Sequence, residues 1–332
     1  MSRKIAYVFL VSIIALCCIC GCSSRQPNVI KETDATESVI QPETQDVLPA
    51  IDELDGQVEL TFDSGESYSG DMEKGIRSGY GEMVFADGSV YEGEWKNDVR
   101  SGEGTFRWVD GSVYTGHWEN DVRNGTGTMV YANGDRYEGN WHNDLRSGSG
   151  KFTSVDGSVY DGDWSGDVRS GSGIYTWSNG ASYEGEWFDN VRCGLGTMIY
   201  ADGTIYVGQW QSDLRNGKGS LRKPDGTVYV GDFANDICHG QGTMTYARGD
   251  IYEGEWNQDY RSGYGVMTYA SGHVYSGNWK ENVRWGEGTL SWPDGDVYSG
   301  GWENDVRSGY GKYTFADGTS VEGNWANDMP VE

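Results

Sequence analysis

Apolar and polar residues alternate one by one along most of the chain. In residues 89–95, SVYEGEW, the side chains of Tyr91 and Trp95 share one face with Gly93 between them, while two glutamates occupy the other face. Residues 102–108, GEGTFRW, continue the same alternation. A period of two is typical of strands with one buried face. Since no helical periodicity follows residue 22, the pattern predicts an all-β protein.

The alternating phrase itself recurs every 23 residues. Its tyrosine stands at Tyr68, Tyr91, Tyr114, Tyr137, Tyr160, Tyr183, Tyr206, Tyr229, Tyr252, Tyr275 and Tyr298, and Val321 takes the twelfth position. A fixed period of this length indicates stacked supersecondary units. We therefore assign residues 56–332 to one repeat array, and predict an elongated single-layer twisted sheet of about twelve stacked 23-residue β-hairpins.

Two turns are predicted in each repeat. One carries Asp-Gly or Asn-Gly, as at Asp87-Gly88, which is the commonest signal for a two-residue hairpin loop. The other lies at Asn97-Asp98, whose residue types tolerate the left-handed conformation. An isolated hairpin is marginally stable, so contacts between neighbouring repeats must stabilise the array.

Glycines occupy fixed places on the aromatic face. Gly93, Gly102 and Gly104 have no side chain to bury, so the rings of Tyr91 and Trp95 from adjoining strands are expected to lie over them. Aromatic cover of this kind offsets the intrinsic cost of a strand glycine, roughly 0.5–1 kcal/mol relative to Ala.

These residues resemble the MORN repeat, whose pattern is Tyr-x-Gly-x-Trp, a short turn, and basic-x-Gly-x-Gly. The matching positions in one repeat are Tyr91, Gly93, Trp95, Arg100, Gly102 and Gly104. The resemblance covers about 270 of 332 residues, and it departs from the family at Asp98 and its equivalents, where Gly is usual. It implies an elongated twisted sheet with a role in scaffolding, self-association or membrane proximity.

The N-terminal residues have the layout of an export signal. Arg3 and Lys4 precede an apolar run over residues 5–19, which is too short for an ordinary membrane span. The following Cys20-Gly21-Cys22 resembles the lipobox of bacterial lipoproteins. This resemblance implies that residues 1–21 are a signal peptide and that Cys22 is acylated, with palmitate among the chains. The alternative is a signal anchor that is never cleaved.

Residues 22–55 are predicted to be a disordered acidic tether after the lipidated cysteine. Residues 23–55 contain no aromatic residue and no glycine, but they contain three prolines and more acids than bases. Low hydrophobicity with net charge is the composition of disorder. We expect an extracytoplasmic protein held by its lipid in the cell membrane or the outer membrane, with the choice between the two membranes left open.

The net charge of the chain limits the classes of partner that it can bind. The chain has 51 acidic and 25 basic residues, a net charge of −26. Such a field repels nucleic acid and anionic lipid headgroups, which disfavours the lipid binding proposed for the MORN family, and it favours cationic partners. The two cysteines of the array, Cys193 and Cys238, should lie about 19 Å apart at two strands per repeat, too far for a disulfide.

Several side chains beyond the repeat pattern are candidates for binding. Trp108, Trp177, Trp285 and Trp292 are expected to face solvent and to form an interaction surface. One arginine per repeat forms a basic ladder, for which pairing with Asp98-type residues or stacking on tryptophan is favoured over anion capture. Similarly, the tyrosine and tryptophan rows are more readily explained as packing than as a groove for sugars or peptides.

No catalytic pattern is found. The four histidines occupy different places in the repeat, and neither a phosphate-binding loop nor a Gly-x-Ser-x-Gly elbow occurs. Equivalent Asp turns should be about 10 Å apart, too far to share a calcium ion. The sequence predicts a non-enzyme without cofactor or metal, acting as a protein-interaction or structural scaffold of the cell envelope. Glycan or peptidoglycan binding through the aromatic face is the alternative, membrane lipid contact is a weaker one, and self-association stays open.

Overall fold

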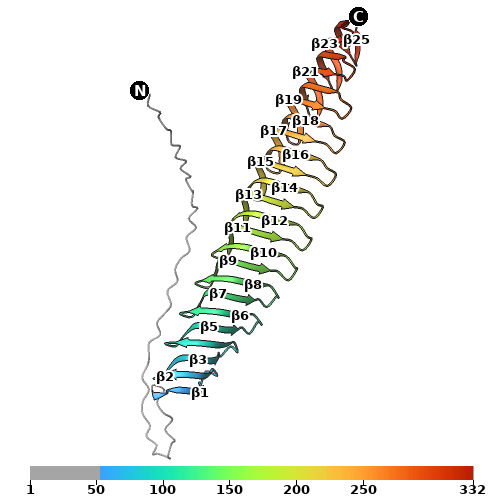
Figure 1. Ribbon diagram of the computed structural model, residues 1–332. Coiled ribbons are helices and arrows are strands. Elements are labelled where there is room, and N and C mark those ends of the chain that lie inside the picture. Colours follow the sequence, from blue (N-terminus) through green and yellow to red (C-terminus); the bar gives the residue numbers. More distant parts are fainter. Residues whose placement is uncertain (1–52, 332) are drawn as a thin grey trace, which may run out of the picture. The chain divides into compact units, whose positions relative to one another are not determined.

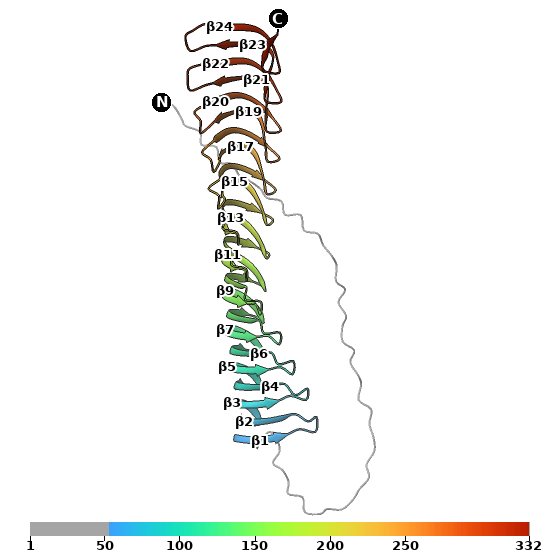
Figure 2. The same ribbon diagram turned by 90° about the vertical axis from the view of Figure 1, so that its right-hand side faces the viewer.

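The computed structural model describes residues 53–331, which form one open antiparallel sheet of 25 strands (Figure 1). Each strand pairs with the next one in sequence, from β1 with β2 to β24 with β25. The array is elongated and twists along its length (Figure 2). Strands β2 to β25 form twelve hairpins, which confirms the predicted all-β array.

Strand lengths follow the repeat, with one strand of seven residues and one of nine in each. The shorter strands are β2 (Ser67–Glu73), β4 (Val90–Lys96), β6 (Val113–Glu119), β8 (Arg136–His142), β10 (Val159–Ser165), β12 (Ser182–Phe188), β14 (Ile205–Gln211), β16 (Val228–Ala234), β18 (Ile251–Asn257), β20 (Val274–Lys280), β22 (Val297–Glu303) and β24 (Ser320–Ala326). The longer strands are β3 (Ile76–Val84), β5 (Val99–Arg107), β7 (Val122–Val130), β9 (Leu145–Thr153), β11 (Val168–Thr176), β13 (Val191–Ile199), β15 (Leu214–Arg222), β17 (Ile237–Thr245), β19 (Tyr260–Thr268), β21 (Val283–Ser291) and β23 (Val306–Thr314). The end strands are β1 (Gly56–Thr61) and β25 (Met329–Val331).

The predictions for the N-terminal segment lie outside the described residues. These are the signal peptide over residues 1–21, the acylated Cys22, and all but the last residues of the tether over 22–55. They stay predictions. Within the described part of the chain, no helix has the length and apolar character needed to cross a membrane.

The two-residue hairpin turn lies at Asn97-Asp98 and not at Asp87-Gly88. Asn97 and Asp98 both have positive φ, 52° and 66°, as a type I′ turn requires. The Asp87-Gly88 pair instead belongs to a three-residue loop closed by Phe85 and Ser89. In this loop the Gly88 N–H donates to Phe85 O (2.8 Å) and the Ser89 N–H donates to Asp87 Oδ1 (2.8 Å). The prediction of a two-residue loop at Asp87-Gly88 is therefore wrong, because Gly after Asp also suits the left-handed position of the longer loop.

One face of the sheet, here called the core face, carries the ladder of tyrosine and tryptophan rings. Tyr91 packs edge to face against Trp95 of its own repeat and against Trp118 of the next, with ring centroids 5.1 and 5.5 Å apart. The eleven ladder tyrosines are 0–1 % exposed and the ladder tryptophans 2–6 %. Adjacent repeats thus bury each other's rings, and these contacts form the hydrophobic core of a sheet that has only one layer.

Glycines under the tyrosine rings are needed for this packing. A side chain at Gly104 would place its Cβ 2.6 Å from Tyr91 Cε2, and one at Gly93 would meet Tyr91 Oη at 2.6 Å. Tyr91 Oη donates to the carbonyl of Glu94 (3.0 Å), which satisfies its hydroxyl inside the core. The predicted aromatic cover is confirmed for Gly93 and Gly104.

Gly102 has a different role from the one predicted. The register between β4 and β5 shifts between Gly93 and Trp95, and Gly102 takes φ 62° at this irregularity. A Cβ at Gly102 would lie 2.5 Å from Glu94 Cδ, so the neighbour of Gly102 is a glutamate and not an aromatic ring. Glu94 Oε1 accepts the Glu103 N–H (3.1 Å), which the bulge leaves without a partner on that side.

Candidate functional site

Each ladder arginine ties its repeat to the next one. The Arg100 N–H and Nε both donate to Asp121 Oδ1 (2.9 and 3.0 Å), and Nη2 donates to Asp121 O (2.7 Å). In return the Asp121 N–H donates to Arg100 O (3.1 Å). The guanidinium lies 4.3 Å from the ring centroid of Trp118, within cation–π range. We call this set of contacts the arginine clamp.

The clamp recurs along the array. Its members are Arg77–Asp98, Arg100–Asp121, Arg123–Asp144, Arg146–Asp167, Arg169–Asn190, Arg192–Asp213, Arg215–Asp236, Arg261–Asn282, Arg284–Asp305 and Arg307–Asp328. The prediction that these arginines pair with acidic neighbours of the Asp98 or Glu type, or stack on tryptophan, is confirmed, although Arg169 and Arg261 pair with asparagine and Arg215 lies over Phe233. The aspartates that depart from the MORN pattern are the side-chain acceptors in most of the clamps.

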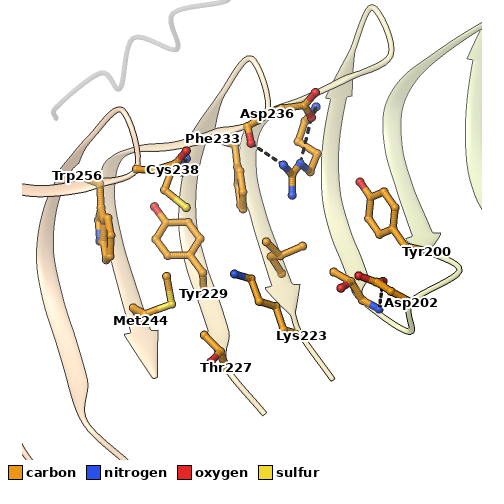
Figure 3. A pocket seen from close by; sticks show the side chains of 14 residues that line it. Tyr200, Asp202, Lys223, Thr227, Tyr229, Phe233, Asp236, Cys238, Met244 and Trp256 are labelled. Atoms are coloured by element: carbon orange, nitrogen blue, oxygen red, sulfur yellow. Dashed lines mark hydrogen bonds and ion pairs between the residues drawn. The ribbon is translucent and has the colours of Figure 1, made fainter. Parts of the chain in front are cut away.

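The clamp is interrupted at one repeat. Cys238 stands where ten other repeats have the arginine, Phe233 stands where most have tryptophan, and Lys223 replaces the aromatic residue found at this loop position in most repeats. These three departures meet at a hollow of about 530 Å³ on the core face, whose lining also includes Trp256 and Asp259 (Figure 3). A hollow of about 480 Å³ also lies on this face beside the intact clamps of Arg77 and Arg100, so what distinguishes the hollow at Cys238 is the missing arginine.

At Asp259 only the two clamp hydrogen bonds donated by backbone N–H groups are present. The Cys238 N–H donates to Asp259 Oδ1 (2.7 Å) and the Asp259 N–H donates to Cys238 O (3.1 Å). Across residues 53–331, no lysine or arginine bonds to the Asp259 carboxylate. On the other side of the hollow, Arg215 is already engaged, with Nε 3.0 Å from Asp236 Oδ1 and its guanidinium 5.4 Å from the ring centroid of Phe233.

The two thiols of the array are free, as predicted. Burial, and after it the neighbouring Asp259 carboxylate, raises the pKa of the Cys238 thiol to about 12. Burial also raises the pKa of Cys193. Because the thiolate is the reactive form, neither cysteine is set up as a nucleophile at neutral pH.

The four tryptophans chosen from the sequence are half-buried, not solvent-facing. Trp108, Trp177 and Trp292 lie in the loops between repeats and pack on core rings, with centroids 4.6 Å from Phe106, 4.6 Å from Tyr175 and 5.4 Å from Tyr313 respectively. Trp285 lies apart from them on β21, under Lys280 Nζ at 4.6 Å. The structure does not join the four into one surface, and their part in binding stays a prediction.

The opposite face, here called the open face, carries exposed apolar side chains that the sequence interpretation missed. Leu195 and Ile199 on β13, Val207 on β14, Val230 on β16 and Ile174 on β11 are 42–63 % exposed. Their signal was present in the repeat alignment, because Val207 and Val230 replace the Glu92 of an earlier repeat.

A groove of about 530 Å³ crosses the open face from β14 to β18. Val207 and Val230 line it together with Gly219, Gly231 and Gly242. Glycines contribute only backbone here, so the groove has a flat floor between rows of side chains. Similar hollows lie at equivalent positions nearer the N-terminal end, over β11–β13 and β5–β8. In residues 53–331, no group of three or more His, Cys, Asp or Glu side chains is placed to hold a metal ion.

Comparison with known proteins identifies the family. The MORN repeat matches eleven consecutive segments of 23 residues from residue 68 to residue 320, and the chain therefore belongs to the MORN repeat family. The repeats and their open single-layer sheet indicate a repeat scaffold or binding module, a class that is generally not enzymatic. No curated protein matches the chain.

Comparison with solved structures finds weak similarities. The TCP10 domain of Danio rerio CPAP in complex with a STIL peptide is 11 % identical, with a TM-score of 0.36 over 74 % of this chain and 98 % of that one. The Drosophila melanogaster SAS-4 TCP domain with a proline-rich motif of Ana2 is 16 % identical, with a TM-score of 0.30 over 54 % and 90 %. Virginiamycin B lyase from Staphylococcus aureus is 11 % identical, with a TM-score of 0.14 over 82 % and 83 %. All three TM-scores are low, and none of these likenesses bears on the function of this chain.

Proposed function

We propose that this MORN protein is a protein-interaction scaffold of the cell envelope, acylated on Cys22 and presenting the open face of its array to a protein partner. The observation that supports this proposal is the difference in exposure of apolar side chains between the two faces of the sheet. The core face buries its rings between repeats, whereas the open face exposes Leu195, Val207 and Val230 at 63, 51 and 54 %. Clustered exposed apolar side chains on a soluble surface are typical of a protein interface.

Burial of the aromatic ladder counts against the glycan alternative. A sugar stacks on an open ring face, and the ladder tyrosines are 0–1 % exposed and the ladder tryptophans 2–6 %. Outside the ladder, rings with surface for such stacking are the half-buried loop rings, among them Trp108, Trp177 and Trp292, and exposed tyrosines such as Tyr264. The net charge of −26 counts against the lipid alternative, since anionic headgroups are repelled.

The envelope location rests on the sequence alone. The apolar run and the Cys20-Gly21-Cys22 motif support export, removal of residues 1–21 and acylation of Cys22. Two or more acyl chains anchor a protein stably, whereas one binds reversibly. Mass spectrometry of the protein purified from membranes is expected to find a diacylglyceryl cysteine at position 22. An intact Met1 would overturn this part of the proposal.

The interaction proposal is tested by pull-down from envelope extracts, with and without polysaccharide digestion. The variant Leu195→Ser/Val207→Ser/Val230→Ser is expected to lose the partner, and digestion should leave capture by the wild-type chain unchanged. The matched control is Val109→Ser/Val155→Ser, since these two loop valines are equally exposed at 66 and 69 % but lie between repeats. Equal loss in both variants, or loss only after digestion, would contradict the proposal.

A further inference from the structure

The array contains ten copies of one guanidinium-binding site. In each clamp the site consists of the aspartate or asparagine Oδ1 and backbone carbonyl of one turn, together with the ring at the tryptophan position of the same repeat. Across the clamps that contain tryptophan, the guanidinium carbon lies 4.1–4.6 Å from the indole centroid. The arginine that occupies the site always comes from the preceding repeat.

The same site is present beside Cys238 without its arginine. Asp259 and Trp256 correspond to Asp121 and Trp118 of the clamp described above, and Tyr229 corresponds to Tyr91. All three line the hollow. Asp259 Oδ1 receives the Cys238 N–H, whereas Asp121 Oδ1 receives both a backbone N–H and an Nε.

We propose that this hollow binds the guanidinium group of an arginine on a partner protein, which then occupies the place of the missing clamp arginine. A planar guanidinium matches the acceptors because it donates in a fixed fork to Oδ1 and the carbonyl while stacking on an indole, which an ammonium does not do. The acidic chain favours a cationic partner in general. The site lies on the core face, so its failure would leave the open-face proposal standing.

The lining explains how such a group can enter. Trp256 is 4 % exposed, and Met244 lies close to it and to Tyr229 in Figure 3. Met244 corresponds to Met129 and Met198, and in those repeats a guanidinium lies on the indole beside the methionine, so this side chain leaves room for the group. Arg215 cannot supply the group, since Asp236 holds it. Lys223 lines the other side of the hollow, and its ammonium group repels an incoming guanidinium.

The test follows the indole N–H resonances of the full chain by ¹⁵N NMR during titration with N-acetyl-arginine amide. The Trp256 resonance, assigned with Trp256→Phe, is expected to shift saturably. N-acetyl-citrulline amide has the same shape without the charge, and should bind at least tenfold more weakly. Lys223→Met is expected to strengthen arginine binding, because it removes the opposing cation.

Two further variants separate this site from general effects of arginine. Cys238→Arg fills the hollow and is expected to abolish the Trp256 shift. Arg284→Cys removes the guanidinium from the equivalent site at Trp302 and Asp305, and is expected to make the Trp302 resonance respond. The proposal is overturned if Trp256 shifts no more than the other ladder indoles, or if its shift persists in the folded Cys238→Arg variant. A missing Trp302 response in folded Arg284→Cys would count equally against it.

Discussion

Replacing Arg123 with Ala is expected to loosen the array at one junction only. The guanidinium of Arg123 lies 4.2 Å from the Trp141 ring centroid, its Nε is 2.8 Å from Asp144 Oδ1, and its Nη2 is 2.9 Å from Asp144 O. Partly desolvated cation–π contact contributes about 1 kcal/mol. The ion pair, whose side chains are 19 and 45 % exposed, adds less than about 1 kcal/mol, and the bond to the carbonyl adds about 1 kcal/mol. The variant should therefore lose about 2–3 kcal/mol of local stability.

Hydrogen exchange measured by mass spectrometry is the suitable assay, because a repeat array opens locally and a single unfolding free energy does not describe it. A loss of 2–3 kcal/mol corresponds to exchange roughly 30–150 times faster. This acceleration is expected in peptides that cover β7 and the Asp144 turn, while repeats several periods away should be unchanged. Uniform acceleration along the chain would instead indicate one cooperative unit.

Two controls make the result specific to the clamp. Asp144→Asn should have little effect, because Asn190 and Asn282 occupy the same position and accept the same bonds. Arg107→Ala removes an arginine that is 52 % exposed and 3.6 Å from Glu92, and should change exchange by less than about threefold. If Arg123→Ala behaves like Arg107→Ala, the clamp does not couple repeats and the reasoning is refuted.

Three further predictions follow from the core face. Gly104→Ala places a Cβ against the Tyr91 ring and should cost about 3 kcal/mol, visible as a lower melting temperature; an unchanged melting temperature would contradict the packing described. Burial raises the pKa of Tyr68 from 10.0 to about 12, and burial raises the pKa of the other ladder tyrosines as well. Their stabilisation is complete below pH 10 and is lost as the pH rises through 12. The part of the tyrosinate absorbance that comes from the ladder tyrosines should therefore appear together with loss of β-sheet circular dichroism, and ladder titration near pH 10 in the folded state would refute it. Cys193 should react with a disulfide reagent before Cys238, whose thiol is buried with a pKa of about 12, and equal rates would contradict the burial of the Cys238 thiol.

The repeat pattern was sufficient to predict the sheet, the residues of the core face and the contacts of the arginines. A period of two places Tyr91 and Trp95 on the same side of the strand, independently of the turn types. Aspartates at a turn close to one arginine per repeat predict ion pairs between the two. The turn types were not predictable in this way. Asp-Gly suits both a two-residue turn and the end of a three-residue loop, and Gly102 reveals its positive φ only once the register shift beside it is known.

The hollow was harder to predict because it depends on contacts between repeats. Lys223, Phe233 and Cys238 are separate departures in a linear alignment, and they lie in two different repeats. They form one site because each clamp arginine bonds to the turn of the following repeat. The spacing of residues along the sequence does not predict this contact. The misplacement of Trp108 has a different origin, since its ring packs on Phe106, two residues earlier in the same repeat.

Hydroxyl-radical footprinting with residue-level mass spectrometry tests most directly whether the core face is interior and the open face is surface. The account predicts that Tyr91 and Trp95, with their equivalents in every repeat, are protected in the folded chain. Leu195 and Tyr264, which are 63 and 56 % exposed on the open face, should be oxidised readily. Ladder tyrosines as reactive as Tyr264 would contradict the account, since the array would then have no interior of its own.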